Sequence, residues 1–202
     1  MKPYHEIAKE LAQKDAVLKK VINSVKKELE PSPGIDIYYS LLHSIVSQQL
    51  STKVAEIIWR RFIDLFADQY PDAKQVLITD DDELRAVGLS WQKIKYINNV
   101  ARFSLDNDLS IENLNEKTDE ELIKYLTQIV GIGKWTVQMI LMFPLDRPNV
   151  FPVDDLGIQT KMKAWYKIDL EKKELKKKLI EISEKWAPYK TLASKYLWKS
   201  EV

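Results

Sequence analysis

Two adjacent carboxylates, Asp154 and Asp155, lie where a proline-rich connector meets an expected short helix. The connector runs from Pro144 to Pro152, and the helix is expected over the segment LGIQTKMKAW. A carboxylate at a helix N-terminus can cap free amides, and the helix dipole stabilises its negative charge. Such a group can also stabilise a developing positive charge or orient an attacking water molecule. On these residues alone capping is the simpler interpretation, and catalysis stays open.

A glycine turn between two expected helices could bind a phosphate. Residues 121–142 read ELIKYLTQIVGIGKWTVQMILM, in which Gly131 and Gly133 separate two stretches with helical apolar spacing. Two glycines around one apolar residue allow a tight turn, and the amides at the start of the next helix would point outward together. Lys134 adds a positive charge beside them. An ordinary helix corner with a capping glycine is the alternative interpretation.

Composition limits the other kinds of chemistry. The 202 residues contain no cysteine and only two histidines, His5 and His43. Disulfides, thiolate zinc sites and cysteine-bound iron–sulfur clusters are therefore excluded, and a histidine-rich metal site is not expected. No apolar run approaches the roughly 20 residues needed to cross a bilayer, and residues 1–10 lack the apolar core of a signal peptide. These features fit an intracellular protein without membrane partners.

The net charge of +1 is unevenly distributed along the chain. Residues 121–202 carry 15 Lys/Arg and 10 Asp/Glu, whereas residues 1–120 carry 16 and 20. A basic C-terminal half could face nucleic-acid phosphates. The run from Glu171 to Lys178 is more simply explained as a solvated helix.

The elements that must position these residues are expected to be helices. Apolar residues recur at helical spacing along most of the chain, which predicts about ten helices with short connectors. Only five glycines and few alternating apolar–polar runs argue against a sheet. One apolar stripe ends before Gln48 and Gln49 and resumes after Ser51, so a helix junction is expected there.

Several segments together resemble one known family. VGIGKWTVQMIL, a loop and VFPVDDLGIQ resemble the helix–hairpin–helix, Gly/Pro-rich loop and aspartate pattern of the base-excision glycosylase superfamily. HSIVSQQLSTKVAEIIWRRF and EKWAPYKTLASKYLW are similar to its 3-methyladenine DNA glycosylase II branch. The resemblance runs from about Tyr38 to Trp198 and implies an all-α fold of two lobes with a DNA-facing cleft between them. We expect residues 35–130 to form a six-helix lobe, and residues 1–34 with 131–202 to form the lobe that carries the hairpin and the aspartate.

The resemblance implies a monofunctional DNA glycosylase that hydrolyses the N-glycosidic bond of 3-methyladenine-type purines in duplex DNA, the first step of base excision repair. Asp155 would be the catalytic carboxylate, because base departure leaves positive charge on the sugar. Asp154 would cap the helix or face solvent. Related enzymes that also cut the strand use a lysine two residues after the second hairpin glycine. That position is Trp135, and the side chain of Lys134 would point about 100° away on a helix, which predicts hydrolysis without strand cleavage.

The same resemblance implies which residues contact DNA. The target base must leave the stack, and a side chain fills the gap. Gln49 is the first candidate for that role and Leu50 the second, with polar contacts at a helix junction as the alternative for both glutamines. The expected hairpin contacts are Gly131, Gly133, Lys134 and Thr136. Lys93 and Lys95, after another glycine turn, form a weaker candidate for a second phosphate contact.

Aromatic side chains are expected to hold a cationic base through stacking and cation–π contacts. The candidates are Trp135, Tyr189, Trp186 and Tyr39. For any single aromatic residue, packing in the core is the alternative.

No cofactor is expected to be required, but the resemblance implies a structural Na⁺ or K⁺ bound by the main-chain carbonyls of Ile129 and Ile132. The expected partner is duplex DNA with damaged bases. The protein is expected to act as a monomer, in the cytoplasm or nucleoid of a bacterium or in the nucleus of a eukaryote. Two alternatives stay open: a catalytically inactive helix–hairpin–helix DNA-binding module, and a bifunctional glycosylase/lyase for other base lesions.

Overall fold

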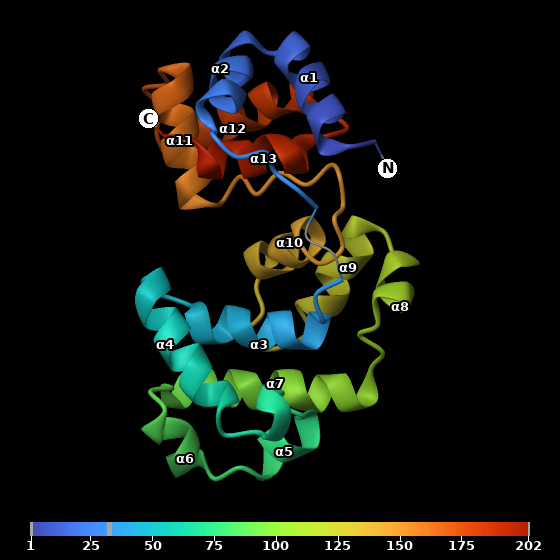
Figure 1. The fold of residues 1–202 in the computed structure, drawn as a ribbon, viewed down its shortest axis with the longest axis vertical. Helices are drawn as coiled ribbons and strands as arrows, with labels where there is room; N and C mark the ends of the chain where they lie inside the picture. The colour runs from blue at the N-terminus through green and yellow to red at the C-terminus, as the bar shows by residue number, and fades with distance from the viewer. Residues whose placement is uncertain (1, 32–33, 202) are drawn as a thin grey trace. The chain divides into compact units, whose positions relative to one another are not determined.

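The computed structural model describes residues 2–31 and 34–201, and within these ranges the chain is helical (Figure 1). The described residues form thirteen α-helices and two 3-10 turns, with no strand, which confirms the predicted all-α fold class. Three of the helices have only five or six residues, too few to show a helical period in the sequence. Among the described residues, no helix combines the length and apolar character that spanning a membrane requires.

The chain divides into two compact units. The first, called here the central unit, comprises residues 34–140, and the terminal unit comprises residues 1–33 and 141–202. We expected the hairpin to belong with Asp155, but residues 131–133 lie in the central unit. The reason is local packing, because Gly131 lies against the Tyr96 side chain and its carbonyl accepts a hydrogen bond from Gln48 Nε2 at 3.0 Å.

The central unit is built around one long helix. Its elements are α3 (Ile37–Ser47), α4 (Thr52–Ile63), η1 (Ala67–Gln69), α5 (Ala73–Ile78), α6 (Asp81–Ala86), α7 (Trp91–Asp106), α8 (Ile111–Asn115), α9 (Asp119–Leu126) and most of α10 (Lys134–Met142). Helix α7 packs against α3, α5 and α6. Six of the helices begin where a side-chain oxygen accepts a main-chain N–H, which stabilises the helix start; the capping residues are Asp36, Asp72, Asp80, Ser90, Ser110 and Thr118.

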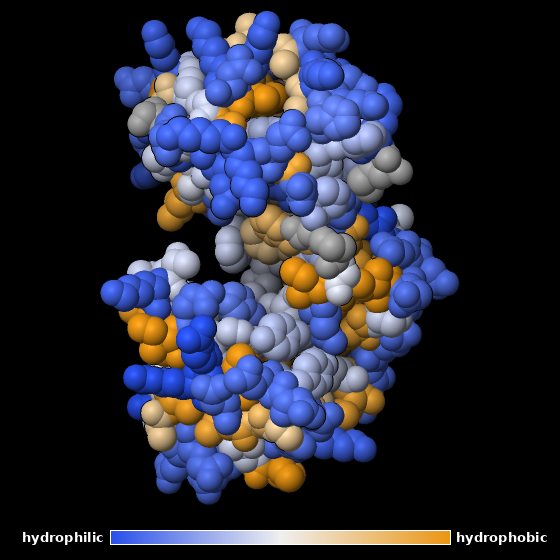
Figure 2. Space-filling view, viewed as in Figure 1, coloured by the Kyte–Doolittle hydropathy of each residue, from blue (hydrophilic) through white to orange (hydrophobic). Residues whose placement is uncertain are grey.

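The terminal unit brings the two ends of the chain into one core. Its elements are α1 (Tyr4–Lys14), α2 (Ala16–Ser24), α11 (Leu156–Tyr166), α12 (Lys172–Ser183), η2 (Glu184–Trp186) and α13 (Lys190–Lys199). Helix α13 packs against α1, α2 and α11. Hydrophilic side chains cover much of the visible surface of each unit, with apolar residues in scattered patches (Figure 2).

Candidate active site

The Gly131–Gly133 turn presents the N-terminus of α10. Gly131 has a φ of +111°, a value that residues other than glycine rarely adopt. The Ile132 N–H donates to the Ile129 carbonyl at 2.9 Å. Gly133 and Lys134 are exposed. The first amides of a helix have no carbonyl partner within it, and the dipole adds positive potential there, so this end can bind an anion. Thr136 is only 4% exposed, which leaves its side chain little surface for the expected DNA contact.

A second turn in the central unit contains a glycine with nearly the same φ. Gly88, between α6 and α7, has a φ of +108°, and the buried Leu89 and the N-cap residue Ser90 follow it. Here, however, Ser90 Oγ accepts the Lys93 N–H and already caps the helix. The ammonium of Lys93 donates to the Val46 carbonyl at 2.7 Å, and burial lowers its pKa. Lys93 therefore has a structural contact that does not support the expected phosphate contact.

The two glutamines at the junction between α3 and α4 have different surroundings. Gln48 ends α3 and donates to the Gly131 carbonyl, so it links the junction to the hairpin. Gln49 is exposed and has a φ of +59°, a left-handed conformation at the tip of the turn, and Leu50 is half-buried beside it. Gln48 thus makes the polar contact at the helix junction that was the alternative interpretation. Gln49 instead has the exposure that a gap-filling side chain needs.

In the terminal unit, Asp155 is both the N-cap of α11 and the partner of a tryptophan. Its Oδ1 accepts the Ile158 N–H at 2.8 Å and the Trp198 Nε1–H at 2.9 Å. The side chain is half-buried, whereas Asp154 is exposed and forms an ion pair with Lys176 at 2.6 Å. Two donors from different helices hold one carboxylate oxygen, so the orientation of Asp155 is set before any substrate binds. Capping and catalysis are compatible here, because the same group can do both.

An aromatic pair that we did not predict lies next to Asp155. The rings of Phe143 and Trp198 are stacked with centroids 5.9 Å apart and an interplanar angle of 21°. Both side chains are half-buried, and Trp198 also binds Asp155. A planar base can stack on such a surface. Trp198 ends the segment EKWAPYKTLASKYLW, so its position was a usable signal, whereas nothing around Phe143 distinguishes it from a core residue.

The close approach of Trp198 to Asp155 depends on a glycine. A Cβ atom at Gly157 would lie 3.1 Å from Asp155 Oδ1 and 3.4 Å from Trp198 Nε1. That spacing is tighter than ordinary van der Waals contact, so even a methyl group would displace the carboxylate or the indole.

Two of the predicted pocket aromatics have contacts to residues other than Asp155 in the terminal unit. Trp186 is fully buried in the terminal core, where its Nε1–H donates to Asp15 at 3.1 Å, so the expected base contact is wrong. Tyr189 precedes α13, nine residues before Trp198, or about 13 Å along the helix axis. Its ring is half-buried and lies 6.0 Å from Lys14 Nζ, and its base contact stays a prediction.

The other two predicted aromatics belong to the central unit. Tyr39 packs edge-on against Trp59 with ring centroids 4.8 Å apart, in a cluster that also contains Tyr70. Trp135, on the first turn of α10, is 43% exposed. Their base contacts stay predictions.

Comparison with known proteins finds relatives that cover most of the chain. A family model for the HhH-GPD superfamily base excision DNA repair protein matches residues 42–188. DNA-3-methyladenine glycosylase 1 of Schizosaccharomyces pombe is 36% identical over 165 residues, which are 81% of this chain and 72% of that protein. YfjP of Bacillus subtilis is 35% identical over 170 residues, 81% of this chain, but the match spans only 58% of YfjP. The solved structure of Schizosaccharomyces pombe 3-methyladenine DNA glycosylase in complex with abasic DNA has a TM-score of 0.86 at 31% identity, covering 96% of this chain and 95% of the other.

Proposed function

The chain belongs to the HhH-GPD superfamily of base excision DNA repair proteins, and from this premise we propose that it is a DNA glycosylase for alkylated purines of the 3-methyladenine type in duplex DNA. One observation carries the proposal: Asp155 is held by the α11 N-terminus and by Trp198, beside the stacked Phe143 and Trp198 rings. This combination supplies a fixed negative charge that can stabilise a sugar cation and a flat aromatic surface on which a planar base can stack.

The reaction is a hydrolysis at the sugar carbon that carries the base. The C1′–N bond breaks, the base leaves with the electron pair, and positive charge spreads over the sugar ring. The Asp155 carboxylate stabilises that charge. Water then adds to C1′ and loses a proton to the carboxylate or to solvent. An alkylated purine that is already cationic leaves as a neutral molecule, so no strong acid is needed.

We propose that the central unit binds duplex DNA. The Gly133 and Lys134 end of α10 would hold a phosphate, and Gln49, or Leu50 after it, would fill the space of the extruded base. Trp135 occupies the place of the lysine found in strand-cutting relatives, so we propose no lyase step.

A structural Na⁺ or K⁺ in the hairpin is a further part of the proposal. The Ile129 carbonyl accepts the Ile132 N–H at 2.9 Å, and a carbonyl oxygen has a second lone pair that can face a cation. The carbonyl oxygens of Ile129 and Ile132 would together supply neutral oxygen ligands, which monovalent cations accept. The cation would help to hold the turn and take no part in the chemistry.

The deciding experiment measures release of 3-methyladenine from methylated duplex DNA. Release into the soluble fraction, without strand cleavage or borohydride-trapped covalent complex, is expected. DNA binding without release would favour the inactive binding module, and trapped complex would favour the glycosylase/lyase.

Replacing Lys134 by Ala should weaken binding to all DNA sequences alike. One lost phosphate contact lowers the slope of log affinity against log salt by about 1. Fluorescence anisotropy over a salt series measures this slope. Lys74→Ala, an exposed lysine on α5, is the control and should leave the slope unchanged. An unchanged slope in Lys134→Ala would remove this residue from the DNA contact.

Replacing Gly157 by Ala should slow base release about tenfold. The added Cβ must push Asp155 or Trp198 by a few tenths of an ångström, and a full 1 Å misplacement can cost about 100-fold. Single-turnover rates at saturating DNA measure the effect. Thr160→Ala, at an exposed position on the same helix, should react at the parent rate.

A further inference from the structure

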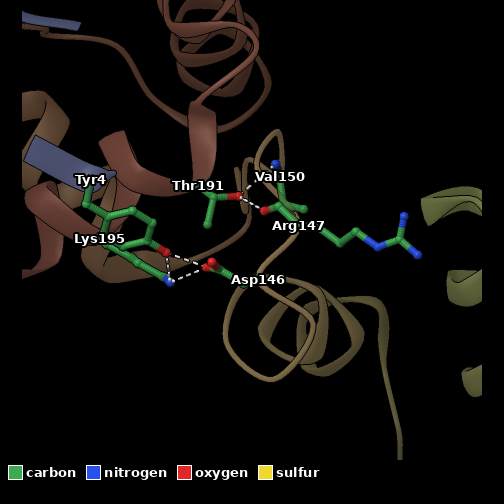
Figure 3. A network of polar contacts seen from close by, with 6 residues as sticks. All are labelled: Tyr4, Asp146, Arg147, Val150, Thr191 and Lys195. Atoms are coloured by element: carbon green, nitrogen blue, oxygen red, sulfur yellow. Dashed lines mark hydrogen bonds and ion pairs between the residues drawn. The ribbon is translucent and has the colours of Figure 1, made fainter. Parts of the chain in front are cut away.

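A buried network lies at the start of the loop that follows α10 (Figure 3). Lys195 of α13 donates to Tyr4 Oη at 2.9 Å and to Asp146 Oδ1 at 3.2 Å, and Tyr4 also donates to Asp146. The side chains of Lys195 and Asp146 are 6% and 19% exposed. Burial lowers the pKa of Lys195 while Asp146 opposes that shift, and burial with Asp146 raises the pKa of Tyr4, which keeps the phenol a donor.

The network belongs to a larger attachment of the loop to α13. Thr191 Oγ1 donates to the Arg147 carbonyl at 2.5 Å and accepts the Val150 N–H at 3.0 Å. The Thr191 N–H donates to the Pro148 carbonyl at 3.0 Å. Asp146 itself has a φ of +45°, an uncommon conformation for a residue other than glycine. Helix α13 therefore holds the loop at several successive residues.

Lys195 connects this attachment to the aromatic pair beside Asp155. Its Nζ lies 5.0 Å from the centroid of the Phe143 ring, within the range of a cation–π contact. Lys195 and Trp198 are three residues apart on α13 and so share one face of the helix. The same face thus holds Phe143 through Lys195 and Asp155 through Trp198.

We propose that Lys195, held by Asp146 and Tyr4, is a positioning residue that fixes Phe143 against Trp198 and so determines how well the site holds an extruded base. The inference rests on the proposed function for its catalytic consequence. Lys195 does not touch the base; it acts through the Phe143 ring. A buried ion pair often contributes little net stability relative to apolar residues of similar volume, because desolvation of both charges offsets their attraction. A positioning role accounts for this pair better than stability does.

Lys195→Met removes the ammonium group and keeps an unbranched side chain of similar length. We expect about a tenfold lower single-turnover rate at saturating DNA, within the usual coupling between contacting residues, and an unchanged KM, because phosphate contacts dominate DNA affinity. The matched control is Lys190→Met, which removes another ion-paired lysine of α13, bound to Glu184 at 2.6 Å. The control should keep the parent rate.

A double-mutant cycle tests whether the effect passes through Phe143. In a Phe143→Ala background, Lys195→Met should cause no further loss of rate. Equal losses in both backgrounds, or a parent rate for Lys195→Met, would overturn the proposal. If Lys195→Met does not fold, the pair Asp146→Gly with Lys195→Met removes both charges and suits the positive φ, and the same outcomes apply.

The position of Phe143 against Trp198 can also be measured without catalysis. The indole N–H resonance of Trp198, assigned with Trp198→Phe, should shift in Lys195→Met because Phe143 leaves the stack, and should not shift further when Phe143 is already Ala. If the unmutated protein releases no base, the proposed function fails while this resonance still decides the role of Lys195. An unshifted resonance in Lys195→Met overturns the positioning role.

Discussion

Asp155→Asn should reduce base release by about 10²–10³-fold or more while DNA binding is kept. A loss of this size is typical when an enzyme loses one preorganised group that stabilises a charge developing in the transition state. Asparagine is as good an N-cap as aspartate, and its side-chain oxygen can still accept from Ile158 and Trp198. The substitution therefore removes the negative charge and little else. Single-turnover release of 3-methyladenine and anisotropy with an uncleaved duplex measure the two properties separately.

Asp154→Asn is the matched control for this prediction. Asp154 is exposed and pairs with Lys176, a contact that is worth little on a solvated surface. This variant should release base at the parent rate. If Asp155→Asn stays as active as Asp154→Asn, Asp155 is only a helix cap and the proposed chemistry is wrong.

Gly131→Ala should destabilise the protein by roughly 2–4 kcal/mol, which combines backbone strain with steric overlap. The φ of +111° lies outside the left-handed region that alanine tolerates, and the new Cβ would lie 2.7 Å from both Cβ and Cδ2 of Tyr96. For a protein of this size the loss corresponds to a fall in Tm of about 5–15 °C. Thermal unfolding followed by circular dichroism measures it.

Gly133→Ala provides the contrast within the same hairpin. A Cβ at Gly133 would meet no other heavy atom within 4 Å, so the unfolding free energy should change by at most about 1 kcal/mol, the cost of a poorer N-cap. Its effect should appear in DNA affinity, because the methyl group would occupy the approach to the α10 amides. Adding Tyr96→Ala to Gly131→Ala should recover the part of the loss that comes from overlap with the ring, but not the overlap with the Cβ of residue 96 or the backbone strain. Equal Tm values for Gly131→Ala and the parent would show that the turn does not need its positive φ.

The site divides into residues that could be predicted and residues that could not. Asp155 at the start of a helix and the tight turn at Gly131 follow from neighbours in the chain, and the structure shows both features. The aromatic contacts to Asp155 could not be predicted in this way. Trp186 and Trp198 lie in one matched segment, but one is fully buried beside Asp15 and the other binds Asp155.

The sequence by itself determined the helical fold class, because helical periodicity, capping residues and glycine turns act between residues a few positions apart. It determined the family through the resemblance of several segments to known members. Only the tertiary structure decided which aromatic rings stand beside Asp155 and which unit holds the hairpin. Those outcomes depend on contacts such as Trp198 with Asp155, 43 residues apart, and Gln48 with Gly131, 83 residues apart. Apolar burial favours every aromatic residue alike, so the partner of each one is set by how the helices pack.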